Sequence, residues 1–308
     1  MSTEPPTELS GEDHIYLLSR SSLDDYLSFM AAYPVNAQEL DRNQTADDWR
    51  QAAALMDELR QSEPTWADDA KLSPLPPAMR RLVKHVQDDP IFTKAYSDAP
   101  VEFGMVELDR LVVSQKLVCV DHLSRLQQRL DPDPSPEQLF RFCLPFEHNP
   151  PECRAGRVSD EMFAFVSDSA DLRFLEAVML RPEQIRGYQA MGPIAGVVAL
   201  VVGYGSNYLN VISAKGRLIL NNGHHRACAL RHLGLTHVPC AVQRATRAEE
   251  FEVLAPRAVR RNPDFYLEQP RPPALKDYFD GRLGKKVRLA MTTKEVRLTY
   301  SVEELDLP

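Results

Sequence analysis

Residues 210–243 constrain the fold of this 308-residue chain more than any other stretch, because each element in them has a clear start and end. Two short β-rich runs, 210–213 and 217–220, flank an Ala-Lys-Gly turn, which predicts a hairpin. A polar turn then leads into a predicted helix from about residue 225 to residue 233, and Gly234 ends that helix in the left-handed conformation. The following LTHVPCAVQ predicts a further strand, so we expect an α/β (α+β) core with a mixed sheet.

The same region lacks carboxylates. No Asp or Glu occurs from residue 184 to residue 248, although seven Lys and Arg residues fall there and the whole chain has a net charge of -8. Ordinary protein surfaces mix both signs, so this segment predicts a local site for an anion. An acidic chain is not expected to coat nucleic acid through its whole surface. A buried apolar segment would account for the missing acids but leaves the basic residues unexplained.

The predicted anion site lies at the turn Asn222-Gly223-His224-His225-Arg226. A glycine before a helix lets a ligand approach the backbone, and the first helical turn presents N–H groups without intrahelical partners. The two histidines and the arginine add donors, which are stronger when an imidazole is protonated beside a phosphate. We therefore expect these five residues to bind a polyphosphate.

This turn resembles the ParB/sulfiredoxin superfamily, whose members carry a G-x-H/R-R turn between a strand and a helix ending in L-x-x-L-G, followed by a strand with a V/I-P-V/C pattern. The resemblance covers residues 210–243 and extends to the strand and Ser-Gln turn at 106–116. It implies a nucleoside di- or triphosphate with Mg²⁺ as cofactor, with Ser114 and Gln115 among the binding residues. The residues that carry it are Gly223, His224, His225, Arg226, Leu230, Leu233, Gly234, Val238, Pro239 and Cys240.

Departures from the family narrow the expected activity. Sulfiredoxins place a catalytic cysteine where this chain has His224, so we expect His224 to face the ligand and do not expect sulfinic acid reduction. His225 would then act through its backbone N–H. Kinase members use a carboxylate near the end of the first strand, and the nearest acids here are Glu107 and Asp109. The expected function is nucleotide binding, with NTP hydrolysis or phosphoryl transfer as the chemistry.

Two alternatives belong to other classes of protein. A DNA-associated regulator or nuclease-like protein would use the basic 184–248 segment on the phosphodiester backbone. A non-catalytic interaction module would retain the fold with an empty pocket. Partition proteins carry a helix-turn-helix region downstream, whereas the residues after 243 predict a loop and a hairpin.

The cysteines predict neither disulfides nor a metal. There are five, with no CxxC spacing, which indicates reduced thiols in a cytoplasmic protein. A zinc site could be drawn from His224, Cys228, His232, His237 and Cys240. Core packing explains these residues better, because Cys228 shares its helix face with leucines and His237 and Cys240 have opposite parity along a strand. We expect Cys228 and Cys240 to be structural.

The chain divides by pattern into several regions. The apolar run at 194–202 is shorter than the roughly 20 residues that a membrane-spanning helix needs, so no membrane partner is expected. Oligomeric state leaves no signal in the sequence. We expect a disordered leader at 1–13, an accessory helical region at 14–97, a core at 98–248 with a helical insertion at 131–190, and a C-terminal loop and β-hairpin at 249–308.

Overall fold

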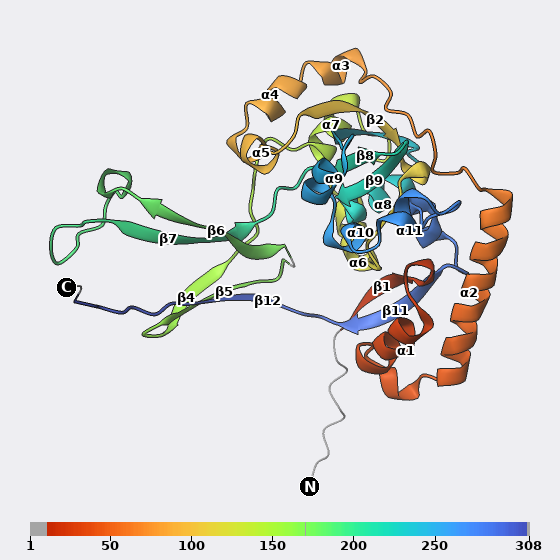
Figure 1. The fold of residues 1–308 in the computed structure, drawn as a ribbon, viewed down its shortest axis with the longest axis horizontal. Helices are drawn as coiled ribbons and strands as arrows, with labels where there is room; N and C mark the ends of the chain where they lie inside the picture. The colour runs from red at the N-terminus through yellow and green to blue at the C-terminus, as the bar shows by residue number, and fades with distance from the viewer. Residues whose placement is uncertain (1–10, 170, 307–308) are drawn as a thin grey trace, which may run out of the picture. The chain divides into compact units, whose positions relative to one another are not determined.

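The computed structural model describes residues 11–169 and 171–306, which form two compact units. The first unit comprises Met1–Glu147 and Asn207–Met291, and the second comprises His148–Ser206 and Thr292–Pro308. Both are shown in Figure 1. Every helix in the described ranges is too short or too polar to cross a bilayer.

A four-stranded mixed sheet forms the centre of the first unit, which confirms the expected α/β class. Strand β10 lies between β2, to which it is antiparallel, and β8, to which it is parallel. A two-residue turn with both residues in the left-handed region, Lys215 and Gly216, joins β8 to β9 and confirms the predicted hairpin. The strands are β2 (Val101–Glu107), β10 (His237–Arg244), β8 (Asn210–Ala214) and β9 (Arg217–Asn222).

Helices α6, α7 and α8 belong to the main core around this sheet. Helix α8 (His224–His232) packs against α6 (Val120–Gln127), and α7 (Pro136–Cys143) packs against β10. Helix α7 begins with a capping box formed by Ser135 and Gln138. The thiols of Cys143, Cys228 and Cys240 are buried in this core, which confirms that Cys228 and Cys240 are packed inside it. Burial raises the pKa of Cys143 to about 12.

A second sheet in the first unit has the strand order β11-β1-β3. It packs with α1 and α2, as Figure 1 shows, and Tyr16, Tyr26 and Phe29 form an aromatic cluster there. Two expectations change, because residues 11–13 of the expected leader and residues 14–17 of the expected helical region form one strand. Residues 1–10 of the expected leader lie outside the described residues. The elements are β1 (Gly11–Leu17), β3 (Leu117–Cys119), β11 (Gly284–Ala290), α1 (Leu23–Ala32) and α2 (Arg42–Ser62).

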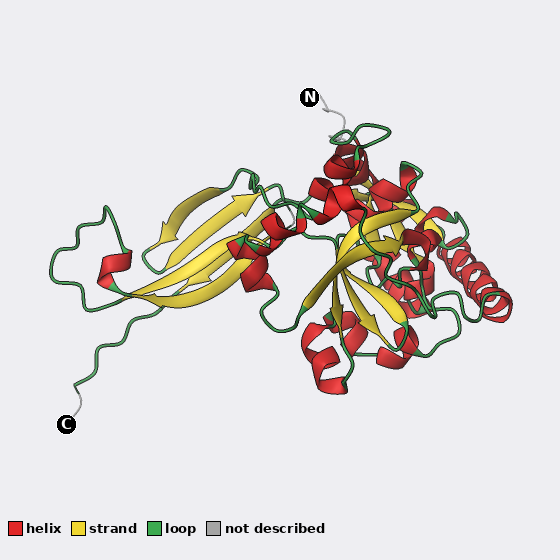
Figure 2. Ribbon diagram, turned by 90° about the horizontal axis from the view of Figure 1, so that it is seen from above, coloured by secondary structure: helices red, strands yellow, loops and turns green. Residues whose placement is uncertain are grey.

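The predicted helical insertion at 131–190 is wrong beyond α7. The second unit consists mainly of strands and loops, as Figure 2 shows, and residues 175–180 alternate between exposed and half-buried side chains as a strand does. The helix that Ser135 caps, α7, is only eight residues long. The strands are β4 (Arg154–Ser159), β5 (Met162–Ser167), β6 (Leu172–Leu180), β7 (Val197–Tyr204) and β12 (Lys294–Thr299).

The predicted C-terminal hairpin is also wrong. Strand β11 pairs with β1, whereas β12 pairs with β5 of the second unit. Each strand therefore finds its partner far away in sequence. The remaining helices are short and connect the sheets: η1 (Leu18–Arg20), η2 (Ala37–Glu39), α3 (Pro77–Arg80), α4 (Val83–Gln87), α5 (Pro90–Ala95), η3 (Leu108–Arg110), η4 (Pro182–Gln184), α9 (Ala248–Leu254), α10 (Arg257–Arg260), α11 (Pro263–Leu267) and η5 (Leu275–Phe279).

Two glycines at the ends of α8 provide a matched test of the turn. Gly223 has φ +92°, and a Cβ there would lie 3.2 Å from the Leu209 Cα; Gly234 has φ +85°, with open space around it. We expect Gly234→Ala to cost about 1 kcal/mol for the backbone conformation, and Gly223→Ala about 2–3 kcal/mol because the contact with Leu209 adds to it. Urea unfolding of both variants measures the difference. Equal losses of stability in the two variants would show that Leu209 moves away from the added Cβ at little cost.

Candidate functional site

The basic residues of the acid-free segment have acidic partners from other parts of the chain. Five of the seven form salt bridges with carboxylates outside residues 184–248. The best buried of these joins Arg217 Nε to Asp68 Oδ1 at 2.6 Å. The excess charge that predicted an anion site is therefore largely neutralised. The pairs are Lys215 with Glu268, Arg217 with Asp68, Arg231 with Asp109, Arg244 with Glu102, and Arg247 with Glu250.

The Gly223 turn has the predicted backbone geometry. Gly223 is the left-handed N-cap of α8, and its N–H donates to the Asn222 Oδ1 at 2.9 Å. Because glycine has no side-chain acceptor, it leaves the first N–H groups of α8 without the usual side-chain cap. The turn packs closely against Leu209, so its shape is also required by the core.

Arg226 is buried, and its guanidinium donates hydrogen bonds to backbone carbonyls within the protein. Its Nη1 donates to the Asn207 carbonyl at 2.6 Å and points at the Cys143 carbonyl at 3.4 Å, and its guanidinium lies over the Phe142 ring. These contacts join α8 to the end of α7 and to the segment before β8. The guanidinium is thus bound to protein carbonyls where the sequence predicted a phosphate.

The two histidines of the turn have different surroundings. His224 is buried, and its Nε2 makes no hydrogen bond within the described ranges. His225 is partly exposed, and its Nε2 accepts a hydrogen bond from the Cys119 N–H at 3.0 Å. Burial lowers the pKa of His224 to about 4; burial and then the neighbouring His122 lower that of His225 to about 3. Both imidazoles are neutral at pH 7, so neither supplies the cation that the sequence analysis assumed.

Glu107 and Asp109, the two acids expected to act with His224, form salt bridges away from it. Asp109 pairs with Arg231 in the last turn of α8, at the opposite end of that helix from His224. Glu107 pairs with Arg110 at 3.2 Å. The structure therefore does not gather His224, Glu107 and Asp109 into one catalytic group.

Ser114 and Gln115 contribute backbone carbonyls to packing. The Ser114 carbonyl accepts from Arg20 Nε at 3.1 Å, and the Gln115 carbonyl accepts from the Tyr278 hydroxyl at 2.5 Å. The first of these bonds leads to a cavity that the sequence analysis missed.

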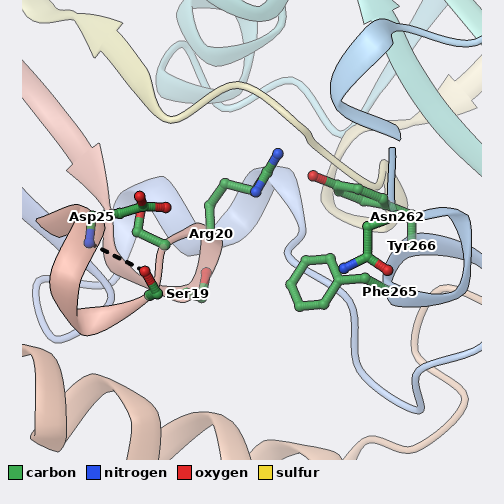
Figure 3. Close-up of a pocket in the computed structure, with 8 residues that line it drawn as sticks. Ser19, Arg20, Asp25, Asn262, Phe265 and Tyr266 are labelled. Carbon is green, nitrogen blue, oxygen red and sulfur yellow. Dashed lines mark hydrogen bonds between the residues drawn. The ribbon is translucent and has the colours of Figure 1, made fainter. Parts of the chain in front are cut away.

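This cavity has a volume of about 240 Å³, and most of the residues that line it carry polar side chains (Figure 3). The side chain of Arg20 and the hydroxyl of Tyr266 point toward each other in Figure 3, and the guanidinium carbon lies 5.2 Å from the centre of the Tyr266 ring. The run Ser19-Arg20-Ser21-Ser22 before a helix was the only local signal for it. The lining residues are Ser19, Arg20, Ser21, Ser22, Asp25, Asn262, Phe265 and Tyr266.

Two buried hydroxyl groups at this cavity have unused hydrogen-bonding capacity. Ser19 Oγ makes no hydrogen bond within the described residues, and the Tyr266 hydroxyl finds no acceptor for its proton there, although the neighbouring Arg20 guanidinium donates toward its oxygen. Burial raises the pKa of Tyr266 to about 12, so the hydroxyl remains a donor at pH 7. Buried polar groups are normally hydrogen-bonded, and an unpaired hydroxyl costs about 1–3 kcal/mol. The wall of the cavity therefore has donor capacity that the protein does not use.

The N-terminus of α1 also faces the cavity. Ser21 and Ser22 line it immediately before the first residue of that ten-residue helix. The helix dipole places partial positive charge at this end. Asp25 also lines the cavity, but its carboxylate pairs with Lys116 at 3.2 Å. Asp24 and Asp25 stand in the first turn of α1, so Arg20 is the residue of the lining that favours an anion.

Comparison with protein-family models, curated proteins and solved structures finds no match to this chain. The ParB/sulfiredoxin resemblance therefore remains a prediction from residues 210–243.

Arg226 provides a test of whether the turn is structural. We expect Arg226→Ala to lower the free energy of unfolding by about 2–4 kcal/mol, because it removes the hydrogen bond to the Asn207 carbonyl and leaves a gap where the buried guanidinium packs on Phe142. Arg244→Ala removes an arginine whose salt bridge with Glu102 is half exposed, so its loss should stay below about 1 kcal/mol. Urea unfolding followed by circular dichroism compares them. An Arg226→Ala protein as stable as Arg244→Ala would contradict the structural role.

His224 predicts a specific acid sensitivity. Its pKa is about 4 in the folded protein and about 6.5 when unfolded, so only the unfolded chain takes up this proton as pH falls through 6.5. Stability is fully present above that pH and declines below it by up to about 1.4 kcal/mol per pH unit. His224→Leu should lose stability less steeply between pH 6.5 and 4.5 in urea titrations. Parallel pH profiles for the two proteins would rule out a neutral buried imidazole.

Proposed function

We propose that this protein binds a phosphate-bearing small molecule in the Arg20 cavity. The observation that carries the proposal is the buried Tyr266 hydroxyl, whose proton has no acceptor in the described residues, beside the Arg20 guanidinium. A phosphate accepts several hydrogen bonds at once and pairs with guanidinium in a charge-assisted geometry. It would use the hydroxyl donors that the protein leaves free.

The shape of the site supports this ligand class. Arg20 is held by its Nε bond to the Ser114 carbonyl, so the guanidinium is oriented before a ligand arrives. Preorganised groups lose less entropy on binding than mobile ones. The N-terminus of α1 adds a dipole of the sign that phosphate sites use. The oriented guanidinium and the helix N-terminus therefore favour the same anion.

The volume of the cavity limits the size of the ligand. Ordinary small-molecule sites measure about 300–1,000 Å³, and this cavity is about 240 Å³. It suits inorganic phosphate, a small phosphomonoester, or the phosphate end of a larger molecule whose remainder lies outside. The resemblance to ParB-like proteins points to the same ligand class, although it would place the phosphate at the Gly223 turn. We do not propose DNA binding, since the basic segment that suggested it is largely ion-paired.

Calorimetry and thermal shift with inorganic phosphate, ribose 5-phosphate, ADP and ATP test the proposal. We expect ribose 5-phosphate to bind and to raise the melting temperature. Arg20→Ala should weaken binding about 10- to 100-fold, the usual size for a charge-assisted hydrogen bond. Tyr266→Phe should weaken it about 2- to 10-fold without loss of stability, because the hydroxyl proton has no acceptor among the described residues.

Arg282→Ala is the matched control. Arg282 is exposed, pairs with Asp280, and does not line the cavity, so removing its charge should leave affinity unchanged. Equal weakening in Arg282→Ala and Arg20→Ala would mean that only net charge matters. If no phosphate compound binds the wild type, the proposal fails and the interaction-module hypothesis gains support.

A further inference from the structure

A second group of chemically active side chains lies in the first unit. Glu12, His14 and Cys119 each offer one ligand atom, and these atoms all lie within 4.8 Å of one another. The pairing of β1 with β3 produces the group, because His14 is directly opposite Cys119 in the antiparallel register. Glu12 is two residues from His14 and therefore lies on the same side of β1. We call these three residues the Glu12 cluster.

We propose that the Glu12 cluster binds a zinc ion through a carboxylate oxygen, an imidazole nitrogen and a thiolate sulfur. Zinc takes this mixture of ligands at bond lengths of about 2.0–2.3 Å, which separates the ligand atoms by about 3.3–3.8 Å in a tetrahedral site. Contraction from 4.8 Å or less is within the reach of side-chain rotation. Mg²⁺ and Ca²⁺ prefer oxygen ligands alone, so the thiol and imidazole exclude them as the matching ion.

Hydrogen bonds around the cluster orient its ligands. His14 Nδ1 lies 3.1 Å from the Glu12 carbonyl, which can only accept, so Nδ1 carries the proton and Nε2 keeps its lone pair. Ligating histidines commonly donate their other N–H in this way. Arg125 Nη2 donates to Glu12 Oε1 at 3.0 Å, and the other oxygen, Oε2, lies 3.5 Å from Cys119 Sγ. Each ligand therefore has a neighbour that fixes its direction.

The thiol is placed at the start of α6. Cys119 is the N-cap of this helix, and its Sγ accepts a hydrogen bond from the His122 N–H at 3.4 Å. Burial raises the pKa of Cys119, while that N–H and the positive end of the helix partly offset it by stabilising the thiolate that a bound metal requires. Binding would release the thiol proton to solvent. Three protein ligands leave the fourth tetrahedral position for water.

Cobalt titration of the full chain, stripped with a chelator and kept in phosphate-free reducing buffer, tests the site. We expect one Co²⁺ per chain, with a thiolate-to-cobalt charge-transfer band that Zn²⁺ abolishes by displacement. Cys119→Ser should lose the band. His14→Gln should weaken binding at least about 100-fold, since outer-shell changes alone reach that size. Circular dichroism shows whether each variant is folded.

Cys153→Ser is the control, because Cys153 is an exposed thiol outside the cluster. It should keep the band and the affinity. A wild-type protein without the band, or a band that disappears with Cys153 rather than Cys119, overturns the proposal. If Cys119→Ser does not fold, His14→Gln decides the question. Tyr266→Phe should bind cobalt with the wild-type affinity, so the proposals for the metal site and for the phosphate site are tested independently.

Discussion

The first unit depends on the two-sided pairing of strand β10. Its residues bond to β2 on one edge and to β8 on the other, and those from Val238 to Gln243 are buried. Because β8 and β10 are parallel, the chain must return to the starting edge of the sheet between them. Strand β9 and helix α8 make this return. The sheet topology therefore accounts for the left-handed Gly223 and the buried Arg226 without any role in ligand binding.

The distribution of charge follows from the same topology. The segment that contains β8, β9, α8 and β10 has no carboxylate of its own, yet most of its basic residues meet acids supplied by distant parts of the chain. Arg271 shows the principle most fully, since it is completely buried and joins Asp277 to Glu63. Such buried pairs favour one arrangement of elements, because separating them leaves an uncompensated charge. The excess of basic residues in this segment is therefore explained by their pairing with carboxylates from distant parts of the chain.

Both proposed sites form where the ends of the first unit meet. Strand β1 pairs with β11 along its whole length, although these strands are more than 250 residues apart in sequence. The same segment of chain supplies Glu12 and His14 to one site and then Ser19 and Arg20 to the other. The partners Cys119 and Tyr266 come from other elements. Neither site exists until the N-terminal strand has docked.

The sequence by itself determined the features whose hydrogen bonds are local. The β8–β9 hairpin, the Ser135 capping box, the left-handed Gly234 and the helix after Gly223 each depend on residues a few positions apart, so their patterns were sufficient. The mixed α/β class followed from these elements.

Tertiary structure decided what each element touches. The sequence pattern of β11 and β12 suggested a hairpin, but each strand has a distant partner. Arg226 has the residue type and the position of a phosphate ligand, and only the fold shows that carbonyls from Asn207 and Cys143 occupy it. Glu12 and Tyr266 carried no signal, because their surroundings come from residues about 100 to 250 positions away. A side chain's chemistry is set by its neighbours in space, and those neighbours exist only after folding.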